Sequence, residues 1–504
     1  MSISASEQSL NSLKQNTKDT MTEFEAVFPA MMELCVHLTT IGADSIEKKD
    51  TILAFFSKVE NLLIGSHFIL HELMASLRLL LNTTIVYEKR YHTQSINLGI
   101  CEAYNYFFGN KNDGVWSLLK PDVLALDNPI LHSYVAIIDA ELEKLGVKHC
   151  NKIMRNSTAH YDNPIKRYDL LNSITDEDVY CKAVSQFMLI HLRISQISTI
   201  IFAIISQITL NNSPENIEQE KPMLDIKAFV EEKLADKLSS NEELANISSE
   251  SLTNVSDNID FLYNNHLNIE KIKEYLDTKV TQAPTNIEVF YQLILLRMMV
   301  GFIRCDLTCA IRAYLSSISS IERSLHLRRI YLTEVSALTH LYGYNEEKKT
   351  KSLWSQLMAI DIDYNENELA SLNEKLEELT SGLDSTCRNL HTHFREDEKL
   401  NILKRYEAYK NLNQIAEINK AHKLLYLCKN IEDYTMSALT RIGKKEQQES
   451  QKQKDRFNTM FKNLRNITME SKISEAMKIQ SITMLDEMER KLASLFDVKK
   501  DLGN

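Results

Sequence analysis

The sequence predicts an all-α protein, and three observations support this fold class. The 504 residues include only 11 glycines and 7 prolines, whereas sheets with tight turns draw heavily on both. The last proline is Pro284, so the following 220 residues contain none. Long stretches place apolar residues three or four positions apart, which is the spacing of one helix face. A chain of this length suffices for two to four domains, each with its own core.

Shifts in composition along the chain predict five regions. These are an N-terminal helical segment (1–60), a strongly apolar helical domain (61–207), a polar linker with short helices (208–284), a second helical domain (285–440) and a C-terminal helical tail (441–504). Between Arg441 and Lys472 the tail carries nine Lys/Arg against four Asp/Glu. This surplus indicates either a solvated helix face or a contact with RNA or a protein partner.

The apolar and charged content argues against several classes of protein. The most apolar run, Phe187–Ile205, includes His191 and Arg193, so it predicts a buried core helix and not a membrane span. Residues 1–10 are polar, which argues against a secretory leader. A net charge of −11 disfavours non-specific coating of nucleic acid but leaves room for a local basic groove. We therefore expect a cytoplasmic protein outside the membrane.

The eight cysteines include no Cys-x-x-Cys pair. Cys305 and Cys309 lie one helical turn apart, but no second ligand pair accompanies them. We expect reduced thiols and no metal site. No nucleotide-binding loop is visible, and no cofactor is expected.

One short motif occurs twice. The first copy is Arg155-Asn156 followed by His160, and the second, 233 residues later, is Arg388-Asn389 followed by His393. By chance, a chain with this Arg and His content contains about half an Arg-x-x-x-x-His match, so one copy alone would mean little. Two copies with Asn after Arg mean more. We expect the first copy near the end of a helix that begins about Ile130, and the second near the end of a helix over about 366–394.

Other residues recur in the same order around the two motifs, with offsets of 232 to 238. The pairs are Glu88 and His92 with Glu322 and His326, Glu102 with Glu334, Phe108-Gly109 with Tyr342-Gly343, and Trp116-Ser117 with Trp354-Ser355. Each pair is weak evidence by itself, but their shared order indicates a duplicated helical domain.

A duplicated all-α domain with Arg-Asn-x-x-x-His near a helix end resembles the HEPN family over about 300 residues. In that family this motif is the ribonuclease signature, and two domains pair so that their motifs form one composite site. The resemblance implies a pseudo-two-fold pair within one chain, with Arg155, Asn156 and His160 facing the second triplet, Arg388, Asn389 and His393. It also implies a toxin or antiviral abortive-defence effector, controlled by an inhibitory antitoxin or an activating partner, and open to homo-oligomerisation.

The residue types suit RNA cleavage without a metal. Attack by the 2′-OH needs a base, an acid for the leaving 5′ oxygen, and positive charge beside the phosphate; histidine and arginine supply these near neutral pH. Five residues along an α-helix rotate by about 500°, so Arg and His of one copy point roughly 140° apart. One copy therefore aims poorly at a single phosphate, whereas two copies that meet across an interface can converge on it.

Plainer interpretations stay open for each of these residues. Arg155 and His160 could be ordinary cations at a helix C-terminus, and the chain could be an inactive helical scaffold that binds RNA or a protein. Glu102 and Glu334 either brace the motif arginines or are structural, and the two tryptophans are expected in the core. Basic residues near the motifs are either an RNA track or solvated: Lys148, Lys152, Lys166, Arg167, Arg395, Lys399, Lys404 and Arg405.

Overall fold

The computed structural model confirms the all-α prediction, because every regular element in the described part of the chain is helical. The described residues are 14–15, 49–109, 113–126, 128–150, 161, 163–174, 178–212, 267, 270, 285–318, 320–343, 346–359, 366–381, 383, 412–470 and 474–501.

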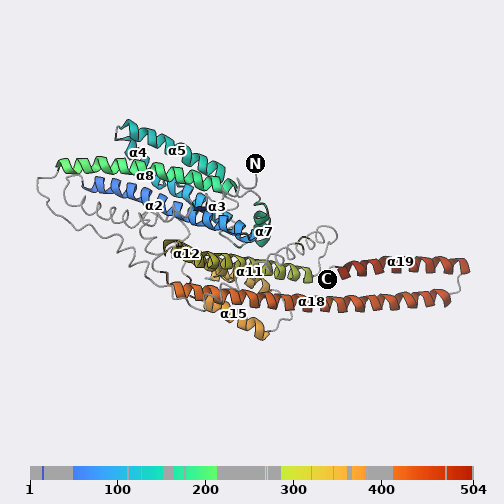
Figure 1. The fold of residues 1–504 in the computed structure, drawn as a ribbon. Helices are drawn as coiled ribbons and strands as arrows, with labels where there is room; N and C mark the ends of the chain where they lie inside the picture. Colours follow the sequence, from blue (N-terminus) through green and yellow to red (C-terminus); the bar gives the residue numbers. More distant parts are fainter. Residues whose placement is uncertain are drawn as a thin grey trace.

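The helices form two bundles that lie against each other, with an arm that projects from the second (Figure 1). The first bundle contains α2 (Lys49–Asn82), α3 (Val86–Phe108), α4 (Val115–Leu124), α5 (Pro129–His149) and α8 (Asp178–Asn212), whereas α7 (Pro164–Asn172) packs into the core of the second bundle. Helix α2 contacts α3, α4 and α8, and its apolar residues are buried among them. The side chain of Asn128 accepts hydrogen bonds from two backbone N–H groups at the start of α5, where Pro129 occupies the first turn.

The second bundle comes from the later half of the chain. It contains α11 (Thr285–Leu315), α12 (Ser320–Leu341), α13 (Glu346–Lys351), α14 (Leu353–Met358), α15 (Glu366–Thr380) and the first part of α18 (Gln414–Glu470). As expected, Trp116 on α4 and Trp354 on α14 are buried, and each indole N–H donates to a side chain of the next long helix. A glycine with positive φ directly follows α3 (Gly109, 71°), and another follows α12 after one residue (Gly343, 85°); this conformation favours glycine.

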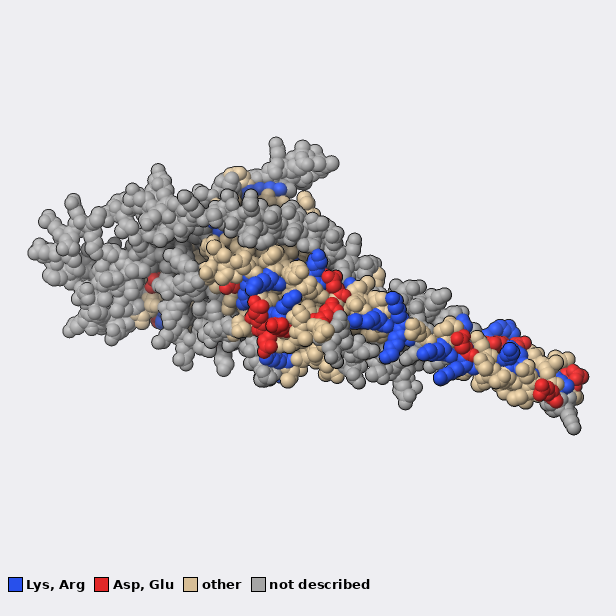
Figure 2. All heavy atoms as spheres, turned by 90° about the horizontal axis from the view of Figure 1, so that it is seen from below, with Lys and Arg blue, Asp and Glu red and all other residues tan. Residues whose placement is uncertain are grey.

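Beyond the second bundle, α18 continues as an arm. Its 57 residues reach past α11, and α19 (Glu475–Asp501) folds back along it in the opposite direction (Figure 1). Arg465 of α18 donates to Asp486 at 2.6 Å and also pairs with Glu489 of α19, which fixes the register of the two helices. Figure 2 shows the arm as a narrow projection with blue, red and tan patches along it.

Several expected boundaries are wrong. The boundaries at residues 61 and 441 fall inside α2 and α18, because composition changes there without any proline to interrupt the helix. The helix expected to run through the first motif ends at His149, where Cys150 takes an extended backbone conformation. The helix expected to reach residue 394 is described only to Thr380. Most of the N-terminal segment and nearly all of the linker after Asn212 lie outside the described residues.

Two further expectations concern membrane and cysteine chemistry. By length and composition, Ser57–Asn82 in α2 is one helix that could cross a membrane, but 94% of its apolar window is buried, as in a core helix. Within α8, Phe187 and Ile194 are buried as predicted for a core helix. The expectation that all thiols are reduced is wrong for Cys101 on α3 and Cys150 after α5, which form a disulfide with Cα atoms 4.9 Å apart.

Candidate functional site

The six motif residues lie outside the part of the chain that the structure describes. They are Arg155, Asn156, His160, Arg388, Asn389 and His393. The structure does describe the residues on both sides of the first motif, the contact between the two bundles, and a pocket beside α7. These features define the surroundings in which a composite site would have to form.

The chain just after the first motif is fastened to the second bundle. Tyr161, the residue after His160, is buried, and its hydroxyl donates to Asp306 Oδ2 of α11 at 2.7 Å. The Arg167 guanidinium also pairs with Asp306 and lies 4.6 Å above the Tyr161 ring. Tyr87 of α3 donates to the other Asp306 oxygen at 2.8 Å. Asp306 therefore gathers three donors from the first half of the chain.

The charges in this cluster follow from burial. Burial and the carboxylate of Asp306 raise the pKa of Tyr161 and of Tyr87 well above the ordinary value, so both keep their protons and donate. Burial opposes the charge of Arg167, but Asp306 together with Tyr161, Tyr87 and Tyr91 outweighs it and raises the arginine pKa. Arg167 is thus a buried structural cation, and both earlier interpretations of it, RNA track or solvated surface, are wrong.

The chain just before the first motif is fastened to the first bundle. Cys150 is disulfide-bonded to Cys101 of α3. Cys150 and Tyr161, which flank residues 151–160, are therefore fixed to different bundles.

Reciprocal ion pairs join the bundles. Arg78 of α2 donates through Nε to Glu322 Oε1 of α12 at 2.9 Å, and Arg312 of α11 donates through Nε to Glu88 Oε1 of α3 at 2.9 Å. The two arginines lie 234 positions apart, and so do the two glutamates. In both cases the first helix of one bundle supplies Arg and the second helix of the other supplies Glu. The two ion pairs are therefore reciprocal across the contact between the bundles.

A second reciprocal feature has the same offset. Glu72 of α2 accepts from Arg328 Nη1 of α12 at 2.9 Å, and Asp306, 234 positions after Glu72, accepts from the first half as described above. Acidic side chains at equivalent places on α2 and α11 therefore both reach the opposite bundle.

Two histidines lie inside this contact. His92 and His326, four positions after the paired glutamates, are fully buried. Burial, together with nearby Arg329, lowers the pKa of His92 well below its ordinary value; burial lowers that of His326 to about 4, although Glu322 opposes this. Conversely, His326 and Arg78 overcome burial and lower the pKa of Glu322 to about 2. At neutral pH the contact holds neutral imidazoles beside charged Arg–Glu pairs.

Glu102 and Glu334 do not occupy equivalent places. An offset of 234 positions pairs Glu88 with Glu322 at the start of α3 and α12, and Gly109 with Gly343 after their ends. The same offset pairs Glu102 with Ser336 and not with Glu334. The difference of two positions turns a side chain by about 200° around a helix. Glu334 is buried toward α18, with its Oε2 atom 4.0 Å from Lys420 Nζ. Burial and nearby Glu417 raise its pKa well above the ordinary value, although Lys420 opposes this.

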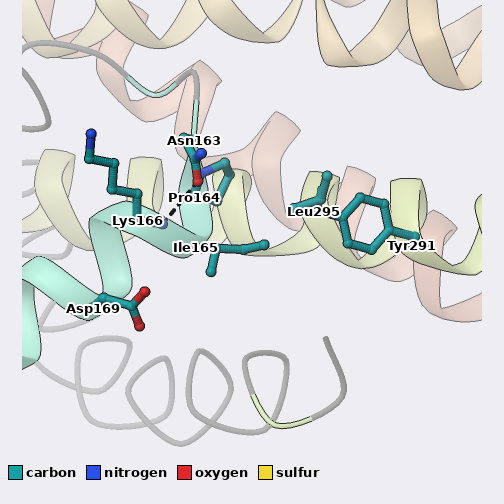
Figure 3. Close-up of a pocket in the computed structure, with 7 residues that line it drawn as sticks. All are labelled: Asn163, Pro164, Ile165, Lys166, Asp169, Tyr291 and Leu295. Carbon is teal, nitrogen blue, oxygen red and sulfur yellow. Dashed lines mark hydrogen bonds between the residues drawn. The ribbon is translucent and has the colours of Figure 1, made fainter. Parts of the chain in front are cut away.

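A pocket of about 330 Å³ opens between α7 and α11 (Figure 3). The first residue that lines it, Asn163, follows Tyr161 by two positions. Its lining residues are Asn163, Pro164, Ile165, Lys166, Asp169, Tyr291 and Leu295. Asn163 caps α7, with Oδ1 accepting from the Lys166 backbone N–H at 2.9 Å. The pocket combines a cation, a carboxylate and an aromatic ring, and its α7 residues follow the first motif in the sequence.

In the sequence, Glu88, His92, Glu322 and His326 recur in matching order, but nothing there indicates their role in the contact. The arginines Arg78 and Arg312 were not predicted from the sequence. The signal for them was present, because they share the offset of 234, but only their partners give them meaning.

Comparisons of the chain with protein-family models, with curated proteins and with solved structures found no match.

Proposed function

We propose that the chain is a metal-independent endoribonuclease of the HEPN type, with two duplicated bundles that pair about a pseudo-two-fold axis. The observation that carries the proposal is the reciprocal contact: Arg78–Glu322 and Arg312–Glu88 relate the bundles as equivalent partners. The anchoring of Cys150 and Tyr161 on different bundles supports a first motif at the boundary between them.

In this proposal the two motifs act as one site. His160 and His393 divide the roles of base toward the 2′-OH and acid toward the leaving 5′ oxygen. Arg155 and Arg388 neutralise the charge that grows on the phosphate, because a guanidinium presents a fork of donors that fits phosphate oxygens. Asn156 and Asn389 orient these groups. The products are a 2′,3′-cyclic phosphate and a 5′-OH end.

The test is RNA cleavage by the full chain in EDTA. His160→Ala and His393→Ala should each lower the rate by about 10²–10⁴-fold, because each removes one proton-transfer group. His422→Ala, at an exposed position of α18, is the matched control and should cleave at the wild-type rate. His391→Ala tests the spacing, since the proposal assigns the second motif to His393. Cleavage that survives either His160→Ala or His393→Ala would refute the composite site.

An unregulated ribonuclease would damage its own cell, so this function implies control by an antitoxin or an activating partner. The linker and the arm are the candidate control elements. Expression of the chain should arrest growth, and the same His variants should relieve the arrest. Growth arrest that persists in both variants would separate toxicity from cleavage.

The projecting arm favours one alternative, a catalytically inactive scaffold that binds RNA or a protein. In that case RNA binding or partner capture would survive in His160→Ala and His393→Ala, and the wild-type chain would leave RNA uncut under every ionic condition.

A further inference from the structure

We propose that the arm formed by α18 and α19 is a homodimerisation surface, on which the arm of a second copy packs to complete a four-helix bundle. The proposal does not depend on the ribonuclease activity. It rests on an apolar face, on the area of that face, and on the distribution of charge between the two helices.

The outer part of the arm exposes apolar side chains in two stripes. Each is between 39% and 64% exposed; they are Met460, Leu464 and Ile467 on α18, and Met477, Met484 and Met488 on α19. The spacings are four and three residues on α18, and seven and four on α19, so each stripe follows one side of its helix.

The two stripes face the same way. On α18 the side that meets α19 carries Phe457 and Phe461, and the stripe is turned from it by about 80°. On α19 the side that meets α18 carries Ile482 and Leu485, and the stripe is turned by about 100° in the same sense. Because the helices run in opposite directions, rotations of the same sense place both stripes on one side of the hairpin. They form a single apolar face.

The size of this face suits a second copy. Its six large apolar side chains are each 39% to 64% exposed, so their exposed area is on the order of the ~800 Å² that each partner contributes to a standard protein interface. Grouped apolar side chains of this kind mark interaction sites, whereas scattered apolar residues are ordinary. Two hairpins that stack face to face bury both patches and give the packing of a four-helix bundle.

Charge also favours a second copy. Between residues 452 and 470, α18 carries five Lys/Arg and two Asp/Glu, whereas α19 carries four Asp/Glu and two Lys/Arg between 475 and 490. A two-fold axis parallel to the arm places α18 of one copy over α19 of the other. Along both edges of the bundle, the basic α18 of one copy then meets the acidic α19 of the other. This attraction favours α18 packed on α19 over α18 packed on α18.

The arm offers a matched control on its opposite side. Met469 on α18 and Ile479 on α19 lie about 100° from the side on which the two helices meet, in the direction opposite to the apolar stripes. Their exposed fractions, 58% and 66%, are close to those of Met484 and Ile467, 63% and 64%. The same residue types can therefore be changed on both sides of the arm at almost equal exposure.

The experiment is sedimentation equilibrium of the full chain, with helicity followed by circular dichroism. The wild-type chain should be a concentration-dependent dimer. Ile467→Glu and Met484→Glu should each raise the dissociation constant about 100-fold, since the two-fold axis uses each change twice at the centre of the patch. Met469→Glu and Ile479→Glu should leave it within about threefold. A wild-type chain that is monomeric up to about 100 μM, or a dimer equally sensitive on both sides of the arm, would overturn the proposal.

Discussion

Removing Arg78 should destabilise both bundles together. Arg78 and Glu322 belong to different bundles, and the Glu322 side chain is fully buried. Arg78→Ala leaves that carboxylate with the Ile318 backbone N–H and neighbouring His326 but without its cation. Stranding one member of a buried pair typically costs about 3–5 kcal/mol. The Arg312–Glu88 pair should cost less when Arg312 is truncated, about 1–3 kcal/mol, because Arg312 is partly exposed and Glu88 keeps the Thr83 hydroxyl as a donor.

Urea unfolding can test this in each bundle separately, because the chain has two tryptophans and each bundle contains one. In Trp116→Phe and Trp354→Phe backgrounds, the fluorescence of the remaining indole reports on a single bundle. Arg78→Ala should lower the midpoint for both reporters by about 1–2 M urea. The control is Arg78→Met with Glu322→Leu, which removes both charges and should recover most of the lost stability.

Two results would refute the reasoning. If Arg78→Ala changed the unfolding free energy by less than about 0.5 kcal/mol, the pair would contribute no more than a surface ion pair. If only the Trp116 reporter shifted, the contact would not couple the bundles, and the pseudo-two-fold interpretation would lose its principal support.

Three other predictions concern buried titratable side chains. The pKa of His326 is about 4, below its ordinary 6.5, so the unfolded chain binds a proton at higher pH than the folded chain does. The unfolding free energy should therefore fall from pH 6.5 toward pH 4, by up to about 3 kcal/mol for this residue. In urea titrations at a series of pH values, His326→Gln should make this fall smaller. Tyr161→Phe removes the donor to Asp306 and should cost about 1–2 kcal/mol in urea, and in the ribonuclease assay it should slow cleavage. Glu334→Gln should change stability by less than about 1 kcal/mol, because its raised pKa already favours a neutral side chain, whereas Glu322→Gln should cost at least about 2 kcal/mol by stranding Arg78.

Each of these three predictions has its own control variant. His422→Gln, at an exposed site, should leave the slope with pH unchanged, and a slope that His326→Gln does not alter would show that other groups carry it. Tyr180→Phe changes a half-buried tyrosine of α8, and an equal loss there would remove the special role of Tyr161. Equal costs for Glu334→Gln and Glu322→Gln would contradict the assigned charge states.

Helix type and core burial could be predicted from the sequence because they depend on local pattern. Spacing of three and four residues specified the helices, and both tryptophans are buried as expected. The helix ends were harder. The helix expected to continue through Arg155 stops at His149, since periodicity alone does not report where tertiary contacts cease to support a helix. The match of Glu102 with Glu334 also failed, by two positions, because near-equal offsets hide a change of helix face.

By itself, the sequence determined an all-α chain with two helical halves and a repeated Arg-Asn-x-x-x-His motif. Only the tertiary structure decided how the halves meet. Arg78 and Glu322 are 244 positions apart, and Arg312 and Glu88 are 224 apart; no local pattern links residues at such separations. Burial then selects among the charged residues, because an ion removed from water is tolerated only beside a partner. The fold supplied those partners, and with them the contact on which a composite site would be built.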